Sequence, residues 1–142
     1  MKQYIGTKLV QAEPCKAWRD AGEHKIGDDG YKVLYPDGYE SWSPKDVFEM
    51  SYRPLAGLTF GQALEAAKTG RKIARAGWNG KNQYVELATA ISYKSTQGEI
   101  INVEHDAIGN KALAFVGTSG VQLGWLASQA DMLAEDWIIV EG

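Results

Sequence analysis

Two stretches of the sequence concentrate the residue types that bind ligands or perform chemistry. Between residues 69 and 81 the chain has four basic residues and no acidic one, although its formal net charge is −3; these are Arg71, Lys72, Arg75 and Lys81. Residues 124–137 combine tryptophan, serine, glutamine and carboxylate side chains. The first stretch offers the local positive charge that a small anion needs, and the second offers hydrogen-bonding and acid–base groups.

Trp78 and Asn79 extend the chemistry of the basic stretch. An indole ring stacks on a nucleobase, and an amide both donates to and accepts from a base edge or a ribose. Each residue type also has a purely structural explanation. Asn79–Gly80 is a strong signal for a tight β-hairpin, because both central residues of a type I′ turn need positive φ. Exposed lysines and arginines are usually just a solvated strand face.

Residues 124–137 include some residues with an expected structural role and some without one. Ser128 has the residue type of a helix N-cap and Asp131 falls at the third helical position, so both are expected to stabilise a short helix. Trp137 begins an apolar run and is expected in the core. Trp125, Gln129 and Asp136 have no such role and are free to line a pocket.

Catalysis is a weaker interpretation of the same residues. Asp131 and Asp136 could act as an acid–base pair only if a pocket raised the pKa of one of them. His24 and His105 are far apart in sequence, and Cys15 is the single cysteine. Because these residues form no recognised metal-binding pattern, we expect neither a metal site nor a cofactor.

The N-terminal 55 residues are expected to form a small β-rich unit. Pro36-Asp37-Gly38 separates two aromatic and β-branched runs, as in a hairpin. Ser43 and Pro44 have the residue types of an N-cap and a first helical residue, which predicts a short helix to about Tyr52. The segment 53–57 is the best candidate boundary, so the division is 1–55 and 56–142.

The second part opens with the clearest helix signal in the chain. Thr59 and Gln62 have the spacing of a capping box, and Gly70 ends the predicted helix. Strands are then predicted on both sides of the hairpin turn at Asn79–Gly80 and after the turn at Gln97–Gly98. Two further strands are predicted at residues 111–116 and 136–141. Strands and helices are segregated rather than alternating, so we predict an α+β fold with a mainly antiparallel sheet and a few short helices.

Composition narrows the class of partner. A net charge of −3 argues against an extended DNA or RNA interface, which needs a basic surface. No apolar run approaches the roughly 20 residues that span a bilayer, and the N-terminus lacks a signal-peptide core. We therefore expect a cytoplasmic protein without a membrane partner.

Two long motifs, "LTFGQALEAAKTGRKIARAGWNGK" and "GWLASQADMLAEDW", resemble a small phage and prophage family that includes the second type of Thoeris anti-defence protein. The resemblance covers roughly Leu58 to Val140. It implies a non-catalytic sponge in the host bacterial cytosol that sequesters a cyclic nucleotide immune signal. The sponge is a homo-oligomer, a tetramer built from two dimers. The implied ligand is glycocyclic ADP-ribose, and some family members are reported to hold cyclic dinucleotides.

Carried onto this sequence, the resemblance makes eight residues candidates for ligand pockets near subunit interfaces; they are Arg75, Trp78, Asn79, Lys81, Trp125, Ser128, Gln129 and Asp131. Residues 1–55 lie outside the family core, and residues 82–123 match only loosely, so pocket walls there would set ligand choice. Two other functions stay open: a nucleotide-cleaving hydrolase using Asp131 and Asp136, and a phage protein-interaction module.

Overall fold

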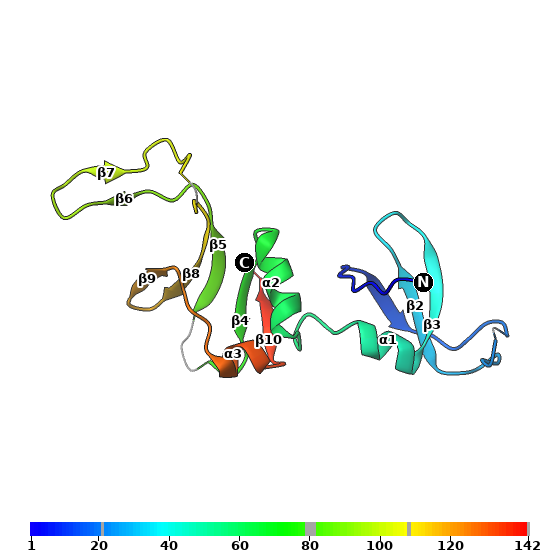
Figure 1. Ribbon diagram of the computed structural model, residues 1–142. Coiled ribbons are helices and arrows are strands. Elements are labelled where there is room, and N and C mark those ends of the chain that lie inside the picture. Colours follow the sequence, from blue (N-terminus) through cyan, green and yellow to red (C-terminus); the bar gives the residue numbers. More distant parts are fainter. Residues whose placement is uncertain (21, 79–81, 108, 142) are drawn as a thin grey trace. The chain divides into compact units, whose positions relative to one another are not determined.

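The chain folds into two compact units, described here from a computed structural model that covers residues 1–20, 22–78, 82–107 and 109–141. The N-terminal unit is Met1–Arg53 and the C-terminal unit is Pro54–Gly142 (Figure 1). The described residues form three helices and ten strands, and all the strand pairings among them are antiparallel. This confirms the predicted α+β class.

The N-terminal unit is a three-stranded sheet with one short helix. Its strands lie in the order β1 (Gln11–Pro14), β2 (Gly30–Leu34) and β3 (Glu40–Pro44), and α1 (Lys45–Ser51) follows directly. The predicted hairpin joins β2 to β3, where the Tyr35 N–H donates to the Tyr39 carbonyl at 2.9 Å.

The start of α1 corrects one prediction. Ser43 does not cap the helix: Pro44 is the N-cap residue, and no side chain caps this end. Ser43 instead pairs with Tyr31 in the sheet. The pairing between β2 and β3 holds Ser43 extended until Pro44, so sheet formation overrides the local capping signal.

The C-terminal unit is built on a five-stranded sheet. Its order is β10 (Trp137–Val140), β4 (Lys72–Arg75), β5 (Tyr84–Ala88), β8 (Ala112–Gly117) and β9 (Gly120–Leu123). Two helices accompany it, α2 (Phe60–Lys68) and α3 (Gln129–Leu133). A separate hairpin of β6 (Tyr93–Lys94) and β7 (Ile100–Ile101) turns at the predicted Gln97–Gly98, with Gly98 at φ +91°.

Helix α2 forms as its sequence predicts. The Gln62 N–H donates to the Thr59 hydroxyl at 3.3 Å, and the Thr59 N–H donates to the Gln62 side-chain oxygen at 3.0 Å, which completes the capping box. Gly70 follows the helix at φ +96°, a conformation that glycine adopts without strain. Ala63 and Ala67 are fully buried, so their small side chains let the helix approach the sheet closely.

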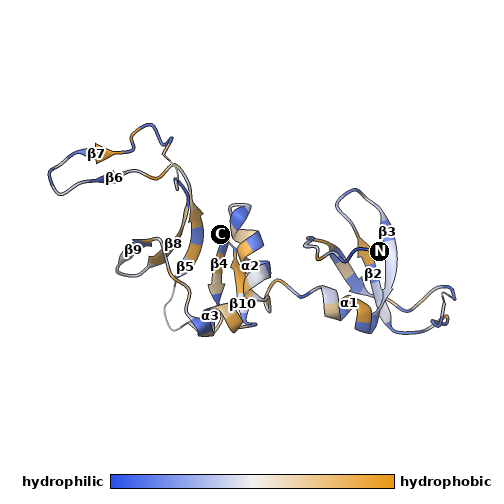
Figure 2. Ribbon diagram, in the orientation of Figure 1, coloured by the Kyte–Doolittle hydropathy of each residue, from blue (hydrophilic) through white to orange (hydrophobic). Residues whose placement is uncertain are grey.

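The core of the C-terminal unit lies between α2 and one face of the sheet. Strand alternation places Ile73, Val85 and Trp137 on this face, and all three are fully buried. Burial of each large side chain contributes about 1.5–3 kcal/mol. Hydrophobic residues accordingly run along these strands, β10 above all (Figure 2). The prediction that Trp137 belongs to the core is confirmed.

None of the helices in the described ranges has the length and apolar content needed to cross a bilayer.

Candidate functional site

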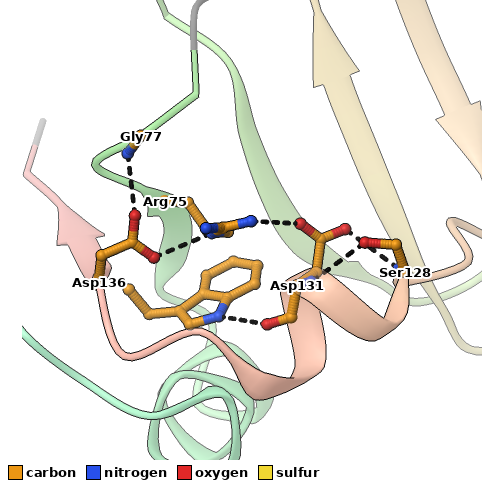
Figure 3. A network of polar contacts seen from close by, with 6 residues as sticks. Arg75, Gly77, Ser128, Asp131 and Asp136 are labelled. Carbon is orange, nitrogen blue, oxygen red and sulfur yellow. Dashed lines mark hydrogen bonds and ion pairs between the residues drawn. The ribbon is translucent and has the colours of Figure 1, made fainter.

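An arginine held between two aspartates forms the centre of the candidate site. The Arg75 Nε donates to Asp136 Oδ1 at 2.9 Å, and its Nη1 donates to Asp131 Oδ1 at 3.0 Å (Figure 3). Pairing of β4 with β10 sets Arg75 opposite Trp137, which brings the preceding residue, Asp136, to the guanidinium. The side chains of Arg75, Asp131 and Asp136 are 22%, 15% and 36% exposed, so the network is partly shielded from solvent.

Both carboxylates have further donors. The backbone N–H of Ser128 donates to Asp131 Oδ2 at 3.1 Å, and the Asp131 N–H donates to the Ser128 hydroxyl at 3.0 Å. This confirms the predicted N-terminus of α3. The Gly77 N–H donates to Asp136 Oδ2 at 3.1 Å, which ties the turn after β4 to the start of β10 (Figure 3).

The surroundings keep both aspartates ionised. Burial acts to raise the pKa of Asp131, but hydrogen bonds from the Ser128 backbone, Arg75, the Ser128 hydroxyl and Trp78 outweigh it, and the pKa is lowered. The Arg75 hydrogen bond, opposed in part by burial and helped by the Gly77 N–H, lowers the pKa of Asp136. Neither carboxylic acid therefore holds a proton at neutral pH, and the three charges sum to −1.

An aromatic cluster adjoins this network. Trp78 lies at its centre, with ring centroids 5.4 Å from Phe115, 6.1 Å from Trp125 and 5.4 Å from Trp137, all in edge-to-face geometry. The Trp137 indole N–H donates to the Asp131 carbonyl at 2.8 Å, which links the cluster to α3. Trp137 is fully buried, whereas Trp78 and Trp125 are only partly buried.

The structure brings together five of the eight sequence candidates; these are Arg75, Trp78, Trp125, Ser128 and Asp131. Gln129 is exposed at the first position of α3, and its side chain forms no hydrogen bond within the described part of the chain. Asn79 and Lys81 lie outside the described residues.

The sequence did not single out Phe115 or Gly77, and it offered Asp136 as a pocket or acid–base group rather than as a partner of Arg75. Alternation along residues 111–116 places Phe115 on the same face as Leu113, but its contact with Trp78 depends on the pairing of β5 with β8. The contact of Gly77 with Asp136 spans 59 positions of sequence. No local signal reveals contacts of that range.

The arrangement suits recognition of an aromatic, hydroxyl-rich molecule. Partly exposed indole rings offer a stacking surface, and ionised carboxylates accept hydrogen bonds from hydroxyl or amino groups. The charge of Arg75 is offset by two aspartates, so this network alone does not attract a phosphate. No group of three or more His, Cys, Asp or Glu within the described ranges is placed to hold a metal ion.

Comparison with known proteins identifies the class. The profile of the Tad2-like family, described as the Thoeris anti-defense 2-like domain, matches residues 58–140. The chain belongs to this family, and membership supports a phage anti-defence role. A curated relative, Thoeris anti-defense 2 of Bacillus phage SP01, is 41% identical over an alignment of 88 residues, and the match covers 58% of this chain and 94% of that protein.

The family match begins at residue 58, so it contains the whole arginine–aspartate network and the aromatic cluster. Residues 1–53, the N-terminal unit, lie entirely outside it.

Proposed function

We propose that the C-terminal unit binds a cyclic nucleotide immune signal of the glycocyclic ADP-ribose class and withholds it, uncleaved, from a Thoeris effector in the bacterial cytosol. The observation that carries this proposal is the pair of partly exposed indoles, Trp78 and Trp125, fixed against ionised carboxylates. Such a surface fits the base and the ribose hydroxyls of a nucleotide. Nanomolar affinity corresponds to about 12 kcal/mol, within reach of stacking combined with charge-assisted hydrogen bonds.

The phosphates of the proposed ligand need a cation, and the four basic residues of segment 69–81 are the candidates. Lys72 Nζ lies 4.6 Å from the ring centre of Tyr84, Arg71 is exposed immediately before β4, and Arg75 is bound by two aspartates. We therefore assign to Arg75 the fixing of Asp131 and Asp136. Lys81, which lies outside the described residues, is kept as a candidate phosphate contact on its residue type alone.

Sequestration accounts for the carboxylates better than hydrolysis does. A hydrolase built on Asp131 and Asp136 needs one of them protonated as a general acid near neutral pH. The pKa of each is lowered instead, because each accepts from Arg75 and from backbone N–H groups. Because these hydrogen bonds hold both carboxylates in place, the two side chains suit a fixed binding surface.

We also propose that the protein works as a homo-oligomer, a tetramer in keeping with the family resemblance. The sheet face opposite α2 carries aliphatic side chains from several strands, and it continues to Val121 and Leu123 on β9, which are exposed by 65% and 48%. Exposed apolar surface of this kind marks an interaction site. A second copy of the same sheet supplies a matching aliphatic face.

Calorimetric titration with glycocyclic ADP-ribose tests the binding site. We expect Trp125→Ala to weaken binding about 5- to 150-fold, since stacking on one base contributes about 1–3 kcal/mol. Trp18→Ala, which removes an indole from the N-terminal unit, is the matched control and should bind as the unaltered protein does. Equal affinities for Trp125→Ala and the control would reject the pocket.

Light scattering during size-exclusion chromatography tests the assembly. We expect the Val121→Glu, Leu123→Glu double variant to elute as a smaller species than the unaltered protein, because two charges would be buried at the interface. Thr118→Glu, on the exposed turn beside these strands, should keep the original mass. A monomer for the unaltered protein would overturn the assembly without touching the ligand proposal.

A further inference from the structure

The N-terminal unit carries a hollow of about 110 Å³ that the family match does not account for. Residues from the loop after β1, from the turn before β3 and from β3 itself line it, most of them aromatic or charged; they are Trp18, Arg19, Tyr39, Glu40, Ser41 and Trp42. The relative from phage SP01 is matched over 94% of its length, so it has no room for a counterpart of this 53-residue unit. The hollow therefore belongs to a unit added to the family domain.

Trp42 forms a rigid wall of the hollow. Its indole N–H donates to the Cys15 carbonyl at 2.8 Å, and the His24 ring contacts it edge-on with centroids 5.8 Å apart. Its six-membered ring lies over Gly30 on the neighbouring strand, where a methyl group would overlap the indole. Because the ring is held on several sides, its position is set before any ligand arrives.

Tyr39 presents a second ring from the turn between β2 and β3. It stacks on Tyr35 at a centroid distance of 5.9 Å and remains mostly exposed. Trp18 is half-exposed on the loop after β1. Three aromatic side chains thus surround one hollow of side-chain size, which is unusual for a surface with no partner.

Several hydrogen-bond donors at this hollow are unused. Within the described residues, the Trp18 indole N–H, the Tyr39 hydroxyl and the Arg19 guanidinium have no hydrogen-bond or ion-pair partner. Glu40 is paired with Lys32 at 3.7 Å. The charge left over at the rim is therefore the positive charge of Arg19.

These features select one class of ligand. Proline-rich segments in the polyproline II conformation dock on aromatic-lined surfaces of small β domains, and their exposed carbonyls accept hydrogen bonds from tryptophan and tyrosine. An unpaired arginine adds a preference for an acidic neighbour. Single-stranded nucleic acid fits less well, because the unit has eight lysines and arginines against nine acidic residues.

We propose that the N-terminal unit binds an extended, proline-containing peptide segment that carries an acidic side chain. A proline ring occupies the hollow between Trp18, Tyr39 and Trp42; peptide carbonyls accept from the Trp18 indole and the Tyr39 hydroxyl; and a carboxylate pairs with Arg19. This activity goes beyond nucleotide binding. It gives the anti-defence domain a means of docking on another protein.

The test is a nuclear magnetic resonance titration of the full ¹⁵N-labelled chain with three synthetic peptides, PPDPPDPP, PPKPPKPP and GGDGGDGG. We expect the indole N–H signals of Trp18 and Trp42 to shift with the acidic proline peptide, more weakly with the basic one, and not with the glycine one. Trp18→Ala and Tyr39→Phe should reduce the affinity. Trp125→Ala, in the other unit, should not.

A charge reversal makes the test sharper. Arg19→Glu should reverse the preference, so that PPKPPKPP binds more tightly than PPDPPDPP, an outcome that mere loss of folding does not produce. The proposal is overturned if neither indole signal shifts at millimolar acidic proline peptide, if the glycine peptide shifts them equally, or if oligothymidylate shifts them instead. Failure here leaves the nucleotide site of the C-terminal unit unaffected, since that site has its own titration.

Discussion

Replacing Arg75 with methionine removes the cation of the site but keeps most of the aliphatic stem. Asp131 and Asp136 would then face each other's charge without compensation. Removing one member of a fully buried pair costs about 3–5 kcal/mol, and of an exposed pair at most about 1 kcal/mol. Asp131 is 15% exposed and Asp136 is 36% exposed, so solvent screens the second contact far more than the first.

We therefore expect Arg75→Met to lower the free energy of unfolding of the C-terminal unit by about 2–3 kcal/mol, of which Asp131 accounts for most. Urea unfolding should be followed by the indole N–H signal of Trp137, because this group donates to the Asp131 carbonyl and reports on the C-terminal unit alone. With a typical urea slope of about 1–3 kcal/mol per molar, the midpoint should fall by about 1 M or more.

Arg71→Met is the matched control, because Arg71 is exposed immediately before the same strand. Its effect should stay within about 0.5 kcal/mol, as for most surface substitutions. Equal midpoints for the two variants would show that the Arg75 network contributes nothing to stability, and the view of Arg75 as the fixing residue of the site would have to be abandoned.

Three further predictions follow from local geometry. The pKa of Asp136 is lowered from 3.8 in the folded chain, so the stabilisation by this carboxylate is present above about pH 4 and is lost as pH falls toward the folded pKa. Asp136→Asn should therefore be less stable than the unaltered protein at pH 7, and between pH 5 and 3 its urea midpoint should fall less than that of the unaltered protein. Thr59→Ala breaks the capping box with Gln62 and should cost about 1 kcal/mol in the same unfolding assay. Gly30→Ala places a methyl group on the Trp42 ring and should displace the Trp42 indole signal while leaving the C-terminal unit unchanged; an unmoved signal would contradict the packing.

Features set by neighbours in sequence were predictable. The capping box Thr59–Gln62 and the N-cap Ser128 form as predicted, because each is closed by residues three positions apart. The structure adds that Asp131 completes a second capping box with Ser128. The turn at Gln97–Gly98 is likewise a local property of glycine at positive φ. Ser43 marks the limit of this reasoning, since its pairing with Tyr31 across the sheet overrides its capping preference.

The sequence predicts which residues belong to the candidate site but not which of them contact one another. Its residues come from the two motifs that carry the family resemblance, yet Arg75 meets Asp131 and Asp136 across 56 and 61 positions of sequence. Those contacts require the register of β4 against β10. Sequence alone therefore offers Arg75 as a cation for a ligand, whereas the folded chain shows two of its nitrogens already bonded to carboxylates.

We propose that the C-terminal unit holds an immune nucleotide without cleaving it. The most direct measurement is to incubate the purified protein with cyclic ADP-ribose isomers and cyclic di- and trinucleotides, remove what stays free, denature the protein by heat and identify the released compound by mass spectrometry. We predict release of one intact cyclic nucleotide in near-stoichiometric amount. Release of a cleaved product, or of no nucleotide at all, would contradict the account.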